Sequence, residues 1–155
     1  MTKSTFVYVT FIRTTPDKLW EALTTPEFMR EYWFGMHCES TWAPGSPWRL
    51  VFTDGSIGDM GEIVEARPGK RLVIKWRNEW KPEMKAEGWS LCTMEIEPVP
   101  DSNPQAVKLS VTHEMDKPDS KFIGAVAGGW PVILSNLKSL LETGSVVVSE
   151  RASAH

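Results

Sequence analysis

The segment from Gly128 to Gly144, GGWPVILSNLKSLLETG, is the feature that most limits how this chain can fold. Its apolar residues recur at three- and four-residue steps, which predicts an amphipathic helix. Pro131 suits the first turn of that helix, and Gly144 suits the left-handed residue just past its end. We expect residues 119–127 to form a separate or kinked helical segment, because two glycines and a proline would interrupt a continuous helix. The apolar stripe consists of Trp130, Ile133, Leu134, Leu137, Leu140 and Leu141.

Most of the chain before this helix has the composition and alternation of β-strands. Asp54-Gly55, a dipeptide typical of tight turns, separates two extended runs. In the other strand segments, alternate residues form one apolar face. Strands of this length with short links predict an antiparallel meander. The segments are residues 5–13, 46–66, 66–76, 89–98 and 107–113, with inward sets such as Leu72, Ile74 and Trp76, or Cys92, Met94 and Ile96, or Val107, Leu109, Val111 and His113.

Two short helices are predicted between the first strand and the others, in residues 14–35. Thr15 is suited to cap the first helix with Pro16 at its first position, and Thr25 with Pro26 repeats the arrangement. The apolar residues of each segment fall on one helical face. These helices can cover only part of a sheet of the predicted size.

An antiparallel sheet with one apolar face needs another layer against that face. The late helix is the only long element available, and at about 1.5 Å per residue it is roughly as long as the strands. The sequence therefore predicts an α+β fold, with a curved antiparallel sheet wrapped around one long C-terminal helix. Because a curved sheet does not close tightly on a straight helix, we expect a mostly apolar cavity between them. We expect one domain over residues 1–144, followed by a tail at residues 145–155.

Charge and composition exclude several functional classes. The formal net charge is -3, so no electrostatic footprint for nucleic acid is present. No apolar run approaches the roughly 20 residues of a membrane helix, and the first ten residues lack the apolar core of a signal peptide. Cys38 and Cys92 cannot build a disulfide framework, and a reducing cytoplasm is the simplest location.

Several stretches of the sequence resemble one known family. Taken in order over residues 5–144, they resemble the activator of heat-shock protein 90 ATPase homologue group in its short bacterial form. That group belongs to the helix-grip superfamily of START and Bet v 1-like domains. The resemblance implies a helix-grip fold, with a ligand cavity, a chaperone contact or cyclisation-type chemistry in the cavity. The stretches are YVTFIRTTPDKLWEALTTPEFMREYWFG, PGSPWRL, PGKRLVIKW and GWPVILSNLKSLLETG.

Eight residues are the candidate lining of the cavity. They are predicted to point inwards and to contact an apolar or aromatic ligand. The same side chains are suited to filling a core, because an aromatic-lined pocket and a packed core share one sequence pattern. The eight are Trp33, Phe52, Trp76, Trp89, Met94, His113, Trp130 and Leu134.

His113 is the candidate for acid–base chemistry, because it ends a strand whose other inward residues are apolar. The alternative is a strand-end histidine bonded to backbone or water. His37, Cys38 and Glu39 lack the spacing of a metal site, because adjacent residues of an extended segment point to opposite faces. We therefore expect no metal and no cofactor, and we interpret both cysteines as buried structural thiols.

Two further segments are candidates for contacts outside the cavity. The charged loop from Arg77 to Gly88 carries Trp80 and Met84, which suggest an exposed protein contact. The tail contains Val146-Val147-Val148. These valines dock on a sheet edge or on a partner, unless the terminus is disordered.

The leading hypothesis is a small cytoplasmic protein, a monomer or homodimer, that binds an apolar or aromatic small molecule in the cavity. A protein-interaction module that contacts a chaperone is the first alternative. A cyclase-like or hydrolase-like enzyme acting in the cavity is the second. Neither nucleic acid nor a membrane is an expected partner.

Overall fold

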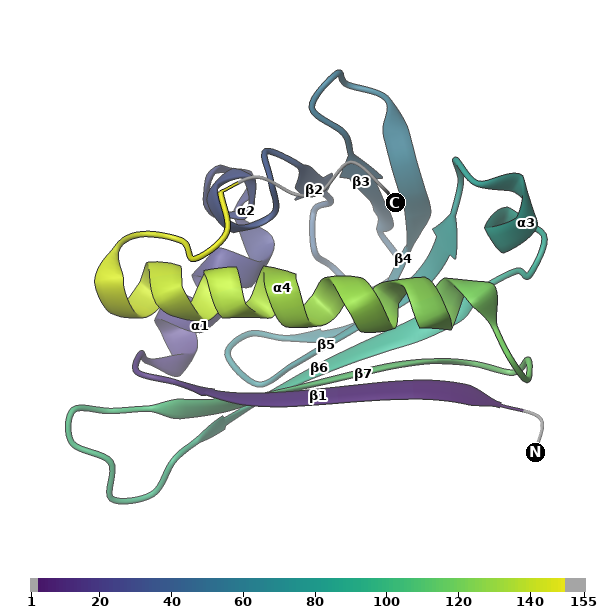
Figure 1. The fold of residues 1–155 in the computed structure, drawn as a ribbon. Coiled ribbons are helices and arrows are strands. Elements are labelled where there is room, and N and C mark those ends of the chain that lie inside the picture. Colours follow the sequence, from purple (N-terminus) through teal and green to yellow (C-terminus); the bar gives the residue numbers. More distant parts are fainter. Residues whose placement is uncertain (1–2, 150–155) are drawn as a thin grey trace.

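Seven strands form one antiparallel sheet in the computed structural model, which describes residues 3–149 (Figure 1). From β2 to β7 each strand pairs with its neighbours in the chain, which confirms the predicted meander, and β1 completes the sheet beside β7. The strands, in the order β1-β7-β6-β5-β4-β3-β2, are β1 (Ser4–Ile12), β2 (His37–Glu39), β3 (Pro47–Val51), β4 (Ile57–Arg67), β5 (Arg71–Asn78), β6 (Ser90–Pro98) and β7 (Val107–Met115). The helices are α1 (Pro16–Thr24), α2 (Pro26–Tyr32), α3 (Pro82–Lys85) and α4 (Lys121–Thr143).

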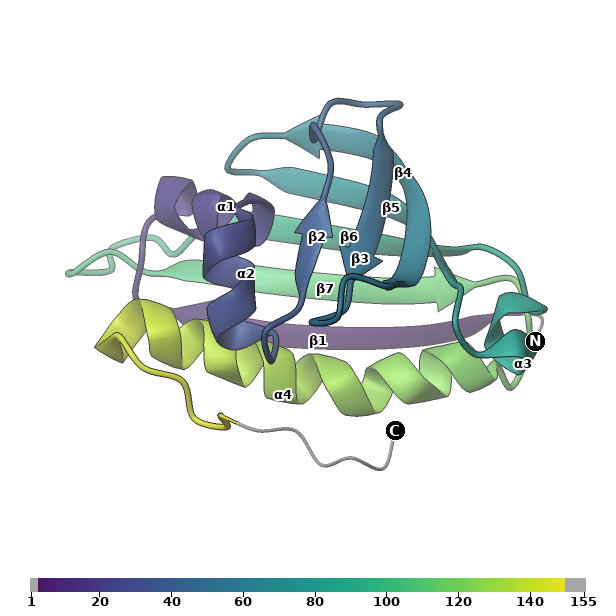
Figure 2. The same ribbon diagram turned by 90° about the horizontal axis from the view of Figure 1, so that it is seen from above.

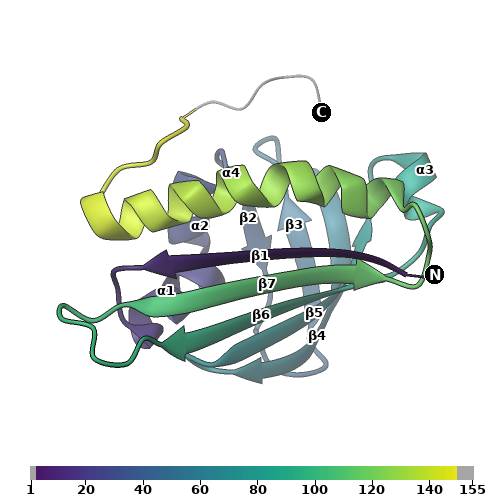
Figure 3. The ribbon, with the colours of Figure 1, turned by 60° about the horizontal axis from the view of Figure 1, so that its bottom comes forward.

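The sheet curves around α4, as the sequence predicts. Figure 3 shows β1 and β7 running beside α4 and the sheet curling away from them towards β3 and β2. Figure 2 shows α1 and α2 at one end of α4 and α3 at the other. The register of the ladder shifts at Leu50/Val51 in β3 and at Ile63/Glu65 in β4. Such irregularities bend a strand and increase its twist, so they place the curvature in β3 and β4.

Alternation along the strands sets the face that meets α4. In β7, every second residue from Val107 to Met115 is buried, and the residues between them are half-buried. His113 is part of that buried row, as predicted, and β6 adds Cys92 and Met94 from the next strand. These side chains join the inner residues of α4 in one core. The core is therefore built from alternate residues of the strands and from the residues on one face of the helix.

Helix α4 is a single helix of 23 residues, so the separate segment predicted for residues 119–127 is wrong. Pro131 lies inside the helix and not in its first turn. The proline removes one main-chain donor, but residues on both sides of it pack on the same core, with Phe122 before it and Leu137 after it buried. Gly144 ends the helix in the left-handed conformation and donates its N–H to Leu140, as predicted. Among residues 3–149, no helix combines the length and apolar character that crossing a membrane requires.

The two early helices begin at the predicted prolines. Thr15 caps α1 by accepting a hydrogen bond from the N–H of Lys18. Thr25 occupies the equivalent position before α2, but its side chain makes no capping bond. The hydroxyl of Tyr32 donates to the carbonyl of Ala22 over 2.9 Å, which locks the two helices together.

The start of the C-terminal tail is held by a buried asparagine of α4. The side-chain oxygen of Asn136 accepts the N–H groups of Val147 and Val148 at 3.0 and 2.8 Å. Its amide nitrogen donates to the carbonyl of Val148 over 2.8 Å. The valines therefore dock on the helix and not on a sheet edge, because Asn136 pairs their main-chain polar groups. Residues 150–155 of the predicted tail lie outside the described part of the chain.

Gly61 marks the closest approach of β4 to β5. It lies opposite Trp76, and a Cβ atom added at this glycine would stand 1.6 Å from the carbonyl oxygen of Lys75. That oxygen belongs to the main chain of a central strand, so it cannot move aside without breaking the ladder. The position therefore requires glycine for space.

We expect Gly61→Ala to lower the free energy of unfolding by more than about 3 kcal/mol, because a main-chain clash must be relieved by moving a strand. Gly124→Ala in α4 is the matched control, since its Cβ would meet nothing within 4 Å. That control is expected to raise stability by about 0.5–1 kcal/mol through helix propensity. Urea unfolding followed by tryptophan fluorescence measures both values. Equal stability of the two variants would contradict the packing described for Gly61.

Candidate functional site

An open cleft of about 950 Å³ lies between α4 and the curled part of the sheet. One wall is α4, from Phe122 to Ile133, and the other comes from β3, β4 and β5 with the loops that join them. Its volume lies within the usual range of small-molecule sites. The wall is rich in aromatic side chains, namely Trp33, Phe34, Phe52, Trp76, Trp80, Phe122 and Trp130.

Four of the eight predicted lining residues lie on this wall: Trp33, Phe52, Trp76 and Trp130. The three indoles pack on one another, with ring centroids 5.6 Å apart for Trp33 and Trp130, 5.8 Å for Trp76 and Trp130, and 6.4 Å for Trp33 and Trp76. Phe52 lies at the rim, where its ring meets Trp80 edge-on. The role of these residues in ligand binding stays a prediction.

The other four predicted residues do not line the cleft. Trp89 was predicted to face inwards, and this is wrong, because its ring is 42% exposed and has Lys75 and Arg77 over it at 5.0 and 4.4 Å. The alternation of β6 explains this. Ser90 and Cys92 are its inward residues, so Trp89, which directly precedes Ser90, points to the opposite face. Met94 and Leu134 border a separate void of about 10 Å³, which is no larger than a single water molecule needs.

The fourth, His113, is fully buried and also does not reach the cleft. The indole N–H of Trp130 donates to Nδ1 over 3.2 Å, and Nε2 lies 2.9 Å from the hydroxyl of Ser90. Because an indole nitrogen can only donate, Nδ1 carries no proton and Nε2 donates to Ser90. Burial lowers the pKa of His113 to about 3. The ring is thus a neutral structural group. This is close to the alternative of a hydrogen-bonded strand-end histidine, although its partners are side chains and not backbone or water.

The polar end of the cleft is formed by two residues that our sequence analysis missed, Asp59 and Asn78. They face each other across β4 and β5, and both are buried. Asp59 accepts the indole N–H of Trp76 over 2.6 Å. Burial raises the pKa of Asp59 to about 6, although the bond from Trp76 favours the charged form. The signal was present in the strand parity, because Asp59 lies two and four residues from the inward positions Gly61 and Ile63.

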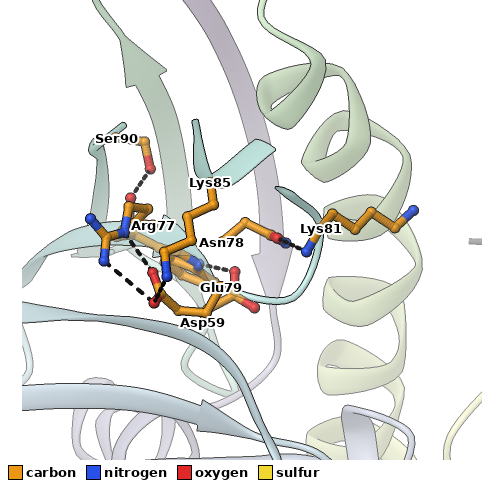
Figure 4. Close-up of polar contacts among 8 residues, drawn as sticks. Asp59, Arg77, Asn78, Glu79, Lys81, Lys85 and Ser90 are labelled. Carbon is orange, nitrogen blue, oxygen red and sulfur yellow. Dashed lines mark hydrogen bonds and ion pairs between the residues drawn. The ribbon is translucent and has the colours of Figure 1, made fainter. Parts of the chain in front are cut away.

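The charged loop from Arg77 to Gly88 is tied to the sheet and forms one rim of the cleft. Glu79 pairs with Arg77 at 2.5 Å and with Lys85 of α3 at 3.3 Å (Figure 4). The side-chain oxygen of Asn78 accepts the N–H of Lys81 over 2.9 Å. As predicted, the loop exposes Trp80, which is 45% accessible, whereas Met84 is half-buried against the core.

Glu87 fastens the far end of this loop to the start of α4. Its carboxylate accepts the N–H groups of Lys121 and Phe122 at 2.9 and 3.1 Å and the hydroxyl of Ser120 at 2.7 Å. Partial burial acts to raise the pKa of Glu87, but these bonds together outweigh it and lower the pKa. A carboxylate at a helix N-terminus is favoured by the helix dipole. The loop is therefore connected to both walls of the cleft.

The residues considered for metal binding form one isolated pair and two separate thiols. His37 and Glu39 lie on one side of β2, 2.9 Å apart, while Cys38 points into the core. Within residues 3–149, no group of three or more His, Cys, Asp or Glu side chains is placed to hold a metal ion. Cys38 and Cys92 are free and buried, and burial raises the pKa of both thiols.

A curved antiparallel sheet closed by a long C-terminal helix over a cleft defines a helix-grip protein. The chain belongs to the family described as activator of Hsp90 ATPase homolog 1-like protein, whose profile matches residues 13–142. This result confirms the resemblance inferred from the sequence. A comparison with curated proteins finds no match.

Solved structures of other proteins share the fold. A protein from Mesorhizobium loti is 24% identical, with a TM-score of 0.75, over 92% of this chain and 100% of that chain. An HSP90 activator from Plasmodium falciparum is 21% identical, with a TM-score of 0.70, over 88% and 95%. The Aha1 dimer from Colwellia psychrerythraea is 19% identical, with a TM-score of 0.70, over 91% and 98%.

Asp59 and His113 should affect the pH dependence of stability in opposite directions. Asp59 binds its proton more tightly in the folded state, so its contribution increases as pH falls through about 6. His113 binds its proton less tightly in the folded state, so stability is lost as pH falls below its ordinary value of about 6.5. Between pH 7 and 5 we expect about 1.4 kcal/mol gained from Asp59 and about 2 kcal/mol lost from His113.

The variant Asp59→Asn separates the two effects. It should lose about 2 kcal/mol of unfolding free energy between pH 7 and 5, whereas the unmodified protein should lose less than about 1 kcal/mol. Urea titrations at pH 7, 6 and 5 measure the difference. Identical pH profiles for the two proteins would contradict the protonation behaviour described for Asp59.

Proposed function

We propose that this chain is a cytoplasmic ligand-binding protein whose cleft takes an apolar or aromatic small molecule. The observation that carries the proposal is the open space of about 950 Å³ beside the wall of indole rings. Cavities of this size with aromatic walls and a few polar groups are the usual form of small-molecule sites. The two free, buried cysteines are consistent with a reducing compartment.

Gly128 gives direct experimental access to this space. It lies on the cleft side of α4, and a Cβ atom added there would meet nothing within 4 Å. A larger side chain at this position can therefore enter the cleft without disturbing the core. Gly124 lies one turn earlier in the same helix, also has open space around it, and does not line the cleft.

We expect 2-(1-naphthyl)ethanol to bind the unmodified protein with a Kd of about 0.1 mM, a modest value for a ligand of this size. Gly128→Leu should weaken binding at least about tenfold, because the new side chain fills the space that the ring would take. Gly124→Leu should bind within about twofold of the unmodified protein. Titration calorimetry gives the affinities, and circular dichroism confirms that both variants are folded. Absence of saturable binding to the unmodified protein would overturn the proposal.

A second candidate function is contact with a chaperone of the Hsp90 class. Family membership favours it, as does the name of the Plasmodium relative, an HSP90 activator. The exposed ring of Trp80 offers a contact residue of the type enriched at protein interfaces. Trp89 is exposed to a similar degree on the opposite, outer face of the sheet.

If the Trp80 face binds the chaperone, Trp80→Ala should weaken capture of the protein by the host's Hsp90-class chaperone at least about tenfold, the size expected for an interface anchor. Trp89→Ala is the matched control and should retain capture. Surface plasmon resonance with immobilised chaperone measures both, and the chaperone's ATPase rate provides a second readout. No binding of the unmodified protein at high concentration would remove this candidate.

A further inference from the structure

The cleft contains a buried carboxyl group that has only one protein partner. Asp59 is 5% exposed, and it lines the cleft. One of its oxygens accepts the N–H of Trp76, which is the only hydrogen bond that its carboxyl group makes with the described residues. The basic side chains near it are engaged elsewhere, because Arg77 and Lys85 both pair with Glu79. The carboxyl group therefore has a free acceptor position at the cleft and no cation beside it.

Asn78, next to Asp59 on the adjacent strand, adds a polar group of known orientation. Its side-chain oxygen is used by the N–H of Lys81, so the amide nitrogen is the atom left without a partner (Figure 4). Asn78 is 7% exposed and lines the cleft as well. The polar end of the cleft thus combines a strong acceptor with a neutral amide donor.

An unpaired carboxylate in a buried position is unfavourable, because it has lost water without gaining a counter-charge. A bound cation that donates a hydrogen bond removes this penalty. The surroundings favour the same charge, because the faces of aromatic rings attract cations. Trp76 contacts Asp59 directly, and Trp33 and Trp130 continue the same wall. A carboxylate beside a wall of indoles is a combination that suits an ammonium group with an apolar body.

We propose that the cleft selects amphipathic amines, in which an apolar or aromatic body lies against the indoles and a protonated nitrogen donates to Asp59. This inference rests on the proposed ligand-binding function and names the class of ligand. The lining has one cation, Lys81, whose ammonium lies over the ring of Trp80 at 4.9 Å, and it has a second carboxylate, Asp54. An anionic ligand would therefore meet two like charges and one engaged lysine.

Three probes with one ring system test the selection: 2-(1-naphthyl)ethylamine, 2-(1-naphthyl)ethanol and 1-naphthylacetate. At pH 7.5 we expect the amine to bind at least about tenfold more tightly than the alcohol, and the acid to bind most weakly. In Asp59→Asn the preference for the amine over the alcohol should shrink to within about twofold. The neutral side chain is of nearly the same shape and can still accept the N–H of Trp76, so the fold should be retained.

Asp101→Asn is the matched control, because Asp101 lies in the loop between β6 and β7 and borders neither cavity. It should keep the full preference for the amine. If the alcohol binds and the amine binds no more tightly, the selection of amines is overturned and ligand binding in the cleft stands. A preference that persists in Asp59→Asn overturns the role of Asp59. If none of the probes binds, the ligand-binding function itself is overturned.

Discussion

The structure depends on one chain of hydrogen bonds that joins α4 to the sheet through His113. The indole N–H of Trp130 donates to Nδ1, Nε2–H donates to the hydroxyl of Ser90, and that hydroxyl donates to the carbonyl of Trp76 over 2.7 Å. Each group donates once, in a single direction, so the chain is fully satisfied only when the imidazole is neutral. A second proton on the ring would place two N–H groups against each other at Trp130. Hydrogen bonding and burial therefore both disfavour the charged ring.

The same chain determines the shape of the cleft. It fixes Trp130 on α4 and the main chain of Trp76 on β5, and these two residues form adjacent parts of the cleft wall. Trp76 extends the network, because its own indole N–H donates to Asp59 on β4. Polar contacts thus run from the helix across four strands to the carboxyl group at the polar end of the cleft. Side chains placed by such a satisfied network hold their positions well.

The fold could be predicted because its signals are periodic and local. The alternation ending at His113 and the helical stripe from Trp130 to Leu141 each specify one face, and a sheet with one apolar face needs a long helix. The separate segment expected before Trp130 was wrong because local propensity was weighed without the packing of Phe122, which holds the first turns of the helix on the core.

The candidate site was less accessible to sequence reasoning. The placement of Trp89 followed from its size and not from its strand parity, and parity puts it on the outer face. Asp59 was also missed because residue type was considered without strand parity: a single acidic residue near a turn is usually solvent-exposed. Its parity with Gly61 and Ile63 places it on the inner face of the sheet. Parity does not tell that this part of the inner face borders an open cleft, because that depends on how the sheet curves. Curvature depends on strand irregularities, which leave little trace in a periodic pattern.

The aromatic residues Trp33, Trp76 and Trp130 belong both to the core and to the cavity wall. These three residues border both the open cleft and the small void on the core side, so their rings separate the two. A substitution of one of these tryptophans therefore alters core packing and the cleft wall together, and it lowers the stability as any large-to-small core substitution does. The residues that face the cleft alone are under no such constraint, since Phe52 is half-buried and Gly128 is exposed. Within this fold, substitutions at the rim and at the polar end can therefore change the cleft while the three indoles preserve the core.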